Sequence, residues 1–281
     1  MQTIARPADF RAAALASPGP RVLVPTMGAL HEGHLTLIRQ ARELAGPAGT
    51  VMVSIFVNPI QFDRPDDLAS YPQPLEADLA ACRAEGADLV FTPAADAMYL
   101  PDRSVTVTES LLSKNLCGAA RPGHFDGVCT IVLKLVMVSA AEIMVFGEKD
   151  YQQLAVIRRM VRDLDLPVSI VGHPTVREAD GLALSSRNVR LSPEHRADAP
   201  RIRQALLAAQ GLLQYGERST DTLLAATRYH LAASPFAKID YVELVDAETL
   251  QPVATIRRPA VLATAVFYGT VRLIDNITLL P

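Results

Sequence analysis

Two histidines stand where an apolar run leads into a helical stretch, in the segment Val-Pro-Thr-Met-Gly-Ala-Leu-His-Glu-Gly-His of residues 24–34. His31 and His34 are three positions apart, so they face the same side once the backbone turns helical. A helix start attracts phosphate through its free N–H groups and its positive dipole end. Gly28 and Gly33 allow the backbone to approach a ligand closely. A lone histidine here is more often a cap or a surface residue, but the pair favours a phosphate site.

The spacing of this histidine pair does not favour a protein-bound metal. Zinc-hydrolase helices carry their histidines four residues apart, whereas His31 and His34 are three apart. Zinc sites also need three or four converging ligands. We therefore expect no metal held by side chains alone.

A second polar group follows an apolar run in residues 145–154, Val-Phe-Gly-Glu-Lys-Asp-Tyr-Gln-Gln-Leu. Lys149 offers a point charge and Asp150 an acceptor, and their natural partners are phosphate and ribose. A third group lies in residues 177–188, where Ser185 and Ser186 precede Arg187. Such a loop can close over a triphosphate, although its composition also suits an ordinary turn before a helix.

Two further segments carry polar side chains that suit a small polyol acid. Asn58 and Gln61 follow an apolar run, and residues 121–127 read Arg-Pro-Gly-His-Phe-Asp-Gly. Either segment can equally be a turn held by its own side chains. The chain contains neither a Walker phosphate loop nor a Gly-x-Gly-x-x-Gly fingerprint, which removes the main support for a P-loop NTPase or a dinucleotide dehydrogenase.

Composition and charge describe a globular protein without a nucleic-acid or membrane partner. The 281 residues are 49% hydrophobic and 20% charged, and the formal charge is −3. No basic field is available for a nucleic-acid backbone. The most apolar stretch, residues 128–141, is shorter than the about 20 residues that cross a bilayer. Three cysteines without paired spacing and a start without a secretion signal indicate a cytoplasmic protein.

Candidate strands and helices alternate along the first part of the chain. We predict strands at 21–24, 51–56, 87–91, 143–146 and 168–171, because these runs are short and nearly continuously apolar. Helices are predicted at 33–45, 75–85, 128–140 and 150–164. This alternation predicts a Rossmann-like α/β domain with a parallel sheet, whose ligands bind at the carboxyl ends of the strands.

After about residue 175 the pattern changes to a smaller α+β domain. Ser192 before Pro193 is typical of a helix start, and we expect one long helix to about residue 215. A helix at 220–232 follows, then β-rich runs at 238–245 and 260–274 with Gly269-Thr270 as a hairpin turn. We expect a Rossmann-like ligand-binding domain at 1–175 and a smaller C-terminal domain at 176–281. A loop, not a linker, is expected around residues 62–74.

Five segments together resemble the pantothenate synthetase family, a branch of the nucleotidyltransferase superfamily. In chain order they are Pro-Thr-Met-Gly-Ala-Leu-His-Glu-Gly-His, Phe-Val-Asn-Pro-Ile-Gln-Phe, Arg-Pro-Gly-His-Phe-Asp-Gly, Phe-Gly-Glu-Lys-Asp-Tyr-Gln-Gln-Leu and Gly-Leu-Ala-Leu-Ser-Ser-Arg-Asn. The match spans residues 25–188. Ile60 and Leu184 stand where the family commonly has methionine, which affects packing and leaves the chemistry unchanged.

The resemblance implies an ATP-dependent ligase that condenses pantoate with β-alanine through a pantoyl-adenylate and releases AMP and pyrophosphate. Residues 1–175 would then bind ATP and pantoate, and residues 176–281 would form a lid. It implies Mg²⁺ with the ATP, a homodimer, and no nucleophilic serine or cysteine. For catalysis it assigns His31, His34, Lys149, Ser185, Ser186 and Arg187. For ATP binding it adds Met27, Gly33, Gly147, Asp150 and Val176. For pantoate binding it assigns Gln61, Gln153, Met27, Phe62, Asn58, Tyr71 and Arg121.

Two rival functions use the same residues. A related nucleotidyltransferase acting on another small substrate would keep the nucleotide on its product, and the two histidines serve that chemistry as well. A nucleotide-binding regulatory module without turnover would need no intact site. The polar positions of the three phosphate-facing segments are all filled, which favours an enzyme.

Overall fold

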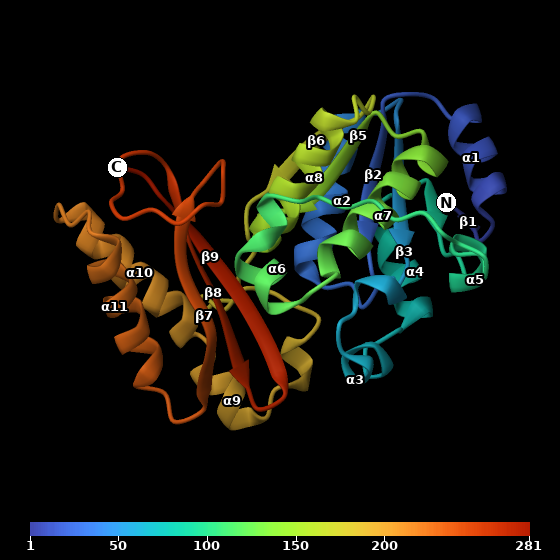
Figure 1. Cartoon of the computed structure of the whole chain (residues 1–281). Helices are drawn as coiled ribbons and strands as arrows, with labels where there is room; N and C mark the ends of the chain where they lie inside the picture. Colours follow the sequence, from blue (N-terminus) through green and yellow to red (C-terminus); the bar gives the residue numbers. More distant parts are fainter. The chain divides into compact units, whose positions relative to one another are not determined.

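The computed structural model describes residues 1–281 and divides into two compact units. Unit 1 contains Met1–Ser110, Arg121–Glu148 and Gln153–Pro174. Unit 2 contains Leu111–Ala120, Lys149–Gln152 and Thr175–Pro281. Each unit has its own sheet, so we describe them separately (Figure 1).

Unit 1 is built on a six-stranded parallel sheet in the order β1-β4-β3-β2-β5-β6. The strands are β1 (Gln2–Ile4), β2 (Arg21–Thr26), β3 (Thr50–Ile55), β4 (Leu89–Phe91), β5 (Ile143–Gly147) and β6 (Ser169–His173). The strand order reverses between β2 and β5, and ligands of open α/β sheets bind beyond the strand ends at such a point. The polar segments that follow β2 and β3 therefore lie at the expected edge.

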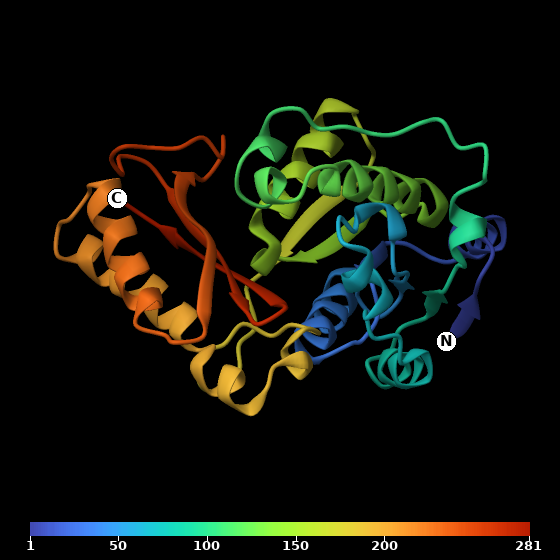
Figure 2. The ribbon, with the colours of Figure 1, turned by 60° about the horizontal axis from the view of Figure 1, so that its bottom comes forward.

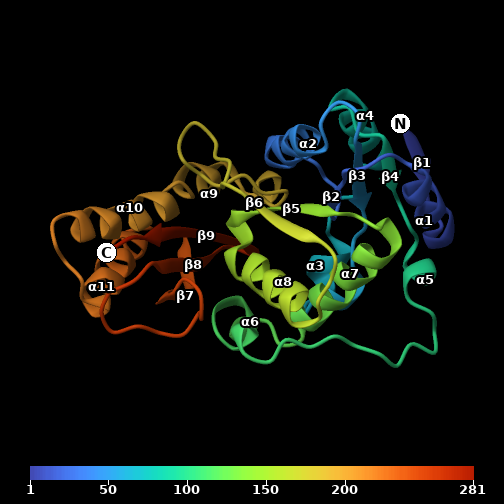
Figure 3. The ribbon, with the colours of Figure 1, turned by 90° about the horizontal axis from the view of Figure 1, so that it is seen from above.

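Helices cover both faces of this sheet (Figure 3). The helices α2 (Glu32–Ala45) and α4 (Leu75–Ala84) lie on one face, and α1 (Pro7–Ala16), α7 (His124–Ser139) and α8 (Tyr151–Asp163) lie on the other. Right-handed crossovers produce this division, because the chain runs one way along the sheet from β2 to β4 and the other way from β4 to β6. The short elements are η1 (Pro59–Gln61), α3 (Pro65–Ala69) and α5 (Ala95–Met98).

The core of unit 1 explains why the segment after β2 is held firmly. Leu37, Ile38, Ala41 and Ala45 of α2 are buried and share one helix face. They pack against apolar side chains of β2 and β3 in one cluster. Burying one such large side chain stabilises a fold by roughly 1.5–3 kcal/mol. The helix α2 that follows this segment is thus fixed against the sheet.

Unit 2 is an antiparallel sheet, β7-β8-β9, with two helices on one face (Figure 2). Its strands are β7 (Ala237–Asp246), β8 (Ala260–Tyr268) and β9 (Val271–Leu279), and its helices are α9 (Pro193–Asp198), α10 (Arg201–Gln214), α11 (Thr220–Ala232) and α6 (Leu116–Ala120). The 3₁₀ turns are η2 (Leu112–Lys114), η3 (Glu148–Asp150) and η4 (Asn188–Arg190). Alternate residues of β9 join α10 and α11 in one apolar cluster.

The structure corrects several details of the predicted elements. The single long helix is wrong, because the chain forms α9 and α10 with a break at Pro200, which lacks the N–H that would continue the hydrogen-bond ladder. Ser192 does cap α9, since its Oγ accepts from His195 N at 3.2 Å. The loop around 62–74 contains the short helix α3. The hairpin at Gly269-Thr270 is confirmed by the pairing of Tyr268 with Val271.

No helix of the chain has the length and apolar character needed to span a membrane. The cysteines Cys82, Cys117 and Cys129 are all unpaired and buried.

Candidate active site

The loop between β2 and α2 is held in a defined shape by side chains beneath it. Thr26 Oγ1 donates to Ser54 O at 2.8 Å and accepts from Gly28 N at 3.2 Å. Gly28 has φ +80° and Ala29 has φ +50°, so two consecutive residues are left-handed. For alanine this conformation costs about 1–2 kcal/mol, so other contacts must stabilise it.

Asp78 of α4 supplies those contacts. Its Oδ2 accepts from Ala29 N at 2.9 Å and its Oδ1 accepts from Leu30 N at 2.8 Å. The side chain is buried, with 2% of Asp78 exposed. A Cβ on Gly28 would lie 2.9 Å from Asp78 Oδ2 and 3.1 Å from an Ile55 methyl group, which is too close for an alanine. The sequence therefore needs glycine at 28 and an acceptor at 78 to form this loop.

The two histidines meet at the start of α2. His31 is the N-cap residue, with φ −133°, and His34 lies in the first turn. Their ring centroids are 4.1 Å apart, and His31 N donates to His34 Nδ1 at 3.3 Å. Because Nδ1 of His34 accepts this bond, the neutral ring carries its proton on Nε2. His34 can thus present an N–H donor at a helix N-terminus, where backbone N–H groups also attract anions.

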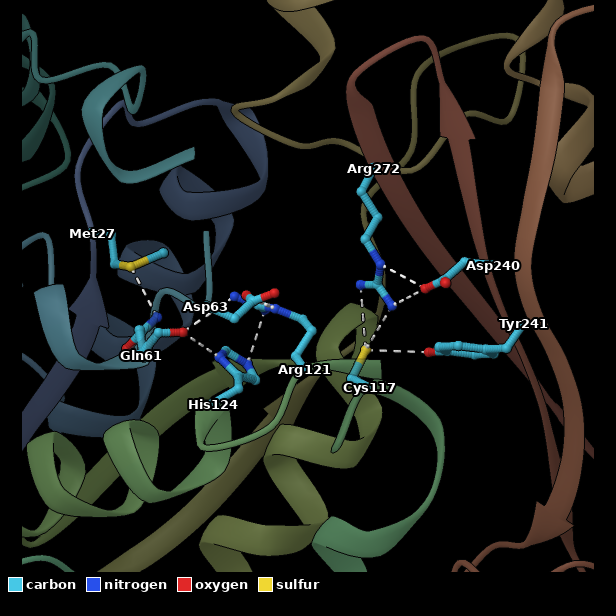
Figure 4. Close-up of polar contacts among 9 residues, drawn as sticks. All are labelled: Met27, Gln61, Asp63, Cys117, Arg121, His124, Asp240, Tyr241 and Arg272. Atoms are coloured by element: carbon cyan, nitrogen blue, oxygen red, sulfur yellow. Dashed lines mark hydrogen bonds and ion pairs between the residues drawn. The ribbon is translucent and has the colours of Figure 1, made fainter. Parts of the chain in front are cut away.

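Gln61 is oriented by a chain of side-chain hydrogen bonds after β3. Asn58 Nδ2 donates to Gln61 Oε1 at 2.9 Å and to Gly127 O at 3.1 Å, and Tyr99 Oη donates to Asn58 Oδ1 at 2.8 Å. Gln61 Nε2 in turn donates to Met27 Sδ at 3.0 Å (Figure 4). Asn58 is 1% exposed, so its amide holds Gln61 in place and offers little surface to a ligand.

Arg121 and His124 support the same residue from the other side (Figure 4). His124 Nδ1 lies 2.8 Å from Gln61 O, and Arg121 donates to that carbonyl at 3.2 Å. Arg121 Nε also pairs with Asp63 Oδ1 at 2.7 Å. Burial acts to raise the pKa of Asp63, but the hydrogen bond and charge of Arg121, a backbone hydrogen bond and the charge of His124 together hold that pKa below its ordinary value. The ionised Asp63 carboxylate therefore helps to hold Arg121 beside Gln61.

An apolar wall and a cavity are formed in part by residues that follow β3. Phe62 and Tyr71 pack edge to face with centroids 5.7 Å apart, and Tyr71 is buried. The cavity has a volume of about 550 Å³, and its lining includes Met27, Val57 and Asp78. Its size suits a small organic ligand.

The segment after β5 carries the next set of predicted residues. Gly147 ends β5, and a Cβ there would meet nothing within 4 Å, so its backbone is open to a neighbouring group. Gln153 lies in α8 and is partly buried. In unit 2, Lys149 Nζ lies 3.0 Å from Asp150 Oδ2, with 21% and 43% of these side chains exposed. The lysine is thus partly shielded and already directed by a carboxylate.

Ser185, Ser186 and Arg187 follow a small hairpin in unit 2. Leu184 N donates to Val176 O at 3.0 Å, and Arg177 pairs with Ala183 across the hairpin. Ser185 Oγ accepts from Arg187 N at 3.2 Å, which turns the backbone there. The three predicted residues are neither fully buried nor fully exposed.

The metal-binding capacity of the chain and the pKa values of its thiols limit the chemistry that the site can perform. No three side chains of His, Cys, Asp or Glu gather in a group that could hold a metal. Burial raises the pKa of the Cys129 thiol to about 12 and that of Cys82 to about 11. These thiols stay protonated near neutral pH and are poor nucleophiles. The polar groups described above include the donor N–H of His34 and the ammonium of Lys149, which suit the binding of an anion.

Sequence reasoning missed three supporting residues, namely Asp78, Tyr99 and His124. Asp78 and Tyr99 lie on helical or turn segments with no motif around them, so nothing in the sequence marked them. His124 does stand inside the segment 121–127, and its place between an arginine and a buried helix was a usable signal.

Comparison with known proteins decides the family. A family model described as Pantoate-beta-alanine ligase matches residues 2–278. The chain belongs to this family. A pantothenate synthetase of Akkermansia muciniphila is 53% identical over 286 residues, covering 99% of this chain and 100% of that protein. One of Myxococcus xanthus is 50% identical, covering 99% and 95%.

Solved structures of the pantoate-β-alanine ligase family share the fold. A crystal structure of pantothenate synthetase from Thermus thermophilus superposes with a TM-score of 0.94 at 44% identity and covers 100% of both chains. A pantoate-β-alanine ligase from Francisella tularensis, described as complexed with β-γ ATP and β-alanine, gives a TM-score of 0.81 at 31% identity, covering 99% and 97%. The predicted family and the Rossmann-like fold with a smaller second sheet are confirmed.

Proposed function

We propose that this chain condenses pantoate with β-alanine in an ATP-dependent reaction, through a pantoyl-adenylate, releasing AMP and pyrophosphate. The observation that carries the proposal is the His31–His34 pair at the start of α2, in the same unit as an oriented Gln61. A helix start that can bind phosphate and an amide side chain held in a fixed orientation are what acyl-adenylate formation needs. Membership of the ligase family supports the same chemistry.

In the first step a pantoate carboxylate oxygen attacks the α-phosphorus of ATP, and the bond to pyrophosphate breaks. Negative charge grows on the phosphoryl oxygens and on the leaving group, so fixed donors lower the barrier. We assign the phosphate oxygens to His31 and His34, with Nε2–H of His34 as a donor. The fixed tautomer of His34 supports this role, because its Nδ1 is already an acceptor.

Residues of unit 2 and of the segment after β5 serve the nucleotide. Lys149 contacts the α- or β-phosphate, and Ser185, Ser186 and Arg187 contact the β- and γ-phosphates. Further nucleotide contacts come from Met27, Gly33, Gly147, Asp150 and Val176, with Asp150 and Gly147 on the ribose. Lys149 is suited to its part because its side chain is only 21% exposed and so its ammonium acts in a less screened setting.

Mg²⁺ accompanies the ATP in this proposal. The chain gathers no carboxylate and histidine cluster that would hold the ion by itself. Mg²⁺ fits such a site because it commonly keeps water and binds through substrate phosphates. When bound it neutralises charge on the β- and γ-phosphates, while the protein residues orient the nucleotide.

The pantoate is held by residues of unit 1. Gln61 and Gln153 bind its hydroxyl and carboxylate oxygens, and Met27 and Phe62 cover its dimethyl carbon. Tyr71 completes the apolar wall against Phe62. Asn58 and Arg121 act through Gln61, since both donate hydrogen bonds to that residue.

In the second step the free amine of β-alanine attacks the acyl carbon of the adenylate, and AMP leaves with the bonding electrons. No residue becomes acylated. The buried and protonated thiols of Cys82 and Cys129 agree with this route. We further propose that the protein is cytoplasmic and forms a homodimer. Sedimentation of the purified protein would check the dimer.

The experiment that tests the function is isotope exchange between ATP and pyrophosphate. We expect exchange that requires pantoate and proceeds without β-alanine, and stoichiometric AMP once β-alanine is added. Exchange that depends strictly on β-alanine would contradict the adenylate intermediate. A stable nucleotidylated product in place of free AMP would identify a nucleotidyltransferase instead.

A further inference from the structure

Two adjacent residues of β9, Asp275 and Asn276, are buried although both are polar, with exposed fractions of 3% and 9%. Successive side chains of a strand point to opposite faces of the sheet. Leu273 and Ile277 belong to the apolar cluster with α10 and α11, so Asp275, which lies between them in the alternation, shares their face. Asn276 points to the other face.

On its face Asp275 holds the hairpin that leads to Ser185. Arg177 Nη1 and Nη2 donate to the two Asp275 oxygens at 2.7 and 2.9 Å, a bidentate pair. Arg177 Nη1 also donates to Gly181 O at 3.1 Å, at the turn of the hairpin. This single guanidinium therefore ties both the start and the turn of the hairpin to β9.

On the opposite face Asn276 holds the backbone of Lys149. Its Nδ2 donates to Lys149 O at 2.9 Å. The residues that follow are also anchored within unit 2, since Tyr151 Oη donates to Ala247 O at 2.9 Å and Gln152 Nε2 donates to Asn115 O at 2.7 Å. The whole segment 149–152 is thus seated on this unit.

The burial of these polar groups needs a reason other than stability. A buried ion pair gains little over well-packed apolar residues of the same volume, because desolvation offsets the attraction between the charges. Its directional bonds do fix geometry, as a bidentate arginine–carboxylate pair allows one orientation. Asp275 and Asn276 are neighbours in the chain, with Cα atoms about 3.8 Å apart. Two segments tied to them therefore keep a constant separation.

We infer that Asp275 and Asn276 are positioning residues for adenylation. They set Lys149 and the Ser185–Arg187 loop at the spacing that lets both contact one polyphosphate, although neither touches substrate. The inference rests on the proposed function, because it assigns those two segments to the same nucleotide. As a consequence β9, which contains none of the five family-like segments, controls the rate of the first step.

The test is a pair of double-mutant cycles read by pantoate-dependent ATP–pyrophosphate exchange. Loss of one directional hydrogen bond that keeps a transition-state contact in place lowers the exchange kcat by about 10-fold, and we expect this for Asn276→Ala and Asp275→Asn. In a Lys149→Ala background Asn276→Ala should lower the rate by less than about twofold, because its effect passes through Lys149. Asp275→Asn should likewise lose its effect beside Arg187→Ala. If Asn276→Ala does not fold, the isosteric Asn276→Asp carries the same cycle.

Asp240→Asn provides the matched control. Asp240 accepts from Arg272 of β9 at 2.9 Å on the same sheet, and Arg272 lies beside Cys117 and Tyr241 (Figure 4). We expect its exchange rate within about twofold of the unaltered chain. A further 10-fold loss from Asn276→Ala in the Lys149→Ala background would reveal a general structural role and overturn the inference, as would unaltered rates in both single variants. An unaltered chain without pantoate-dependent exchange would overturn the proposed function and this inference with it.

Discussion

Removal of the Asp78 carboxylate should misplace the two histidines without touching either of them. The carboxylate accepts from Ala29 N and Leu30 N, one bond to each oxygen. Hydrogen bonds to a charged acceptor contribute about 1.5–3 kcal/mol each. Asp78→Ala leaves both N–H groups without this acceptor, so the upper bound of its effect on unfolding is about 3–6 kcal/mol. Asp78→Asn retains one acceptor oxygen, and we expect about half of that loss.

The effect on activity should exceed the effect on folding in the asparagine variant. Ala29 is left-handed, so without the second bond the loop can relax toward an ordinary conformation. A shift of about 1 Å at a catalytic group costs about 10²-fold in rate. We therefore expect Asp78→Asn to fold at 25 °C and to lose about 10²-fold in pantoate-dependent exchange.

Denaturant unfolding and the exchange assay, run on the same preparations, separate the two effects. Asp66→Asn is the control, because Asp66 is exposed and lies in the neighbouring helix α3. Its stability and exchange rate should match those of the unaltered chain. An Asp78→Asn protein that is fully folded and exchanges at the normal rate would refute the reasoning, since the loop would then keep its shape without the carboxylate.

Three further predictions concern the residues assigned to the phosphates, the unfolding free energy at acid pH and the metal ion. Lys149→Ala and His34→Ala should each lower the exchange rate by about 10²–10³-fold, as loss of a charge-stabilising donor does, and near-normal rates would remove the assignment. Burial acts to raise the pKa of Asp198, but hydrogen bonds from Ser234 and Arg201 lower it overall. The ionised Asp198 carboxylate therefore stabilises the fold fully above the unfolded pKa of about 3.9. This stabilisation is lost as the pH falls through the lower pKa of the folded protein. Asp198→Asn should therefore make the unfolding free energy decline less steeply below about pH 4. EDTA should abolish exchange while leaving the melting temperature unchanged, because no side-chain cluster binds a metal in the fold; a lowered melting temperature would reveal a structural ion.

The strands of unit 1 were predictable because they are covered on both faces. Runs such as 143–146 are apolar throughout, and β5 occupies Ile143–Gly147. The edge strand β1 was not predicted, because three residues carry too little pattern to stand out. The long helix after Ser192 failed for a related reason. Its apolar spacing continues across Pro200, and only the missing N–H of that proline divides it.

The candidate site was predictable where side chains face a ligand and hidden where they face the backbone. His31, Lys149 and Arg187 follow apolar strands or stand in polar loops, where their chemical types are conspicuous. Asp78 and Asn276 instead bond to peptide groups 48 and 127 positions away in the chain. No local pattern can reveal such a partner, because any residue has a peptide N–H or carbonyl to offer.

Asn58 shows why the visible residue types still need the structure. Its type and its place after β3 suggested a ligand contact, but its amide is used by Gln61, Gly127 and Tyr99. Substitution at Asn58 would therefore act on pantoate through the orientation of Gln61. The geometry of the acid-binding residues then depends on a tyrosine 41 positions further along the chain, just as the loop carrying the histidines depends on Asp78. A search for activity-altering substitutions confined to the motif segments would miss both of these supports.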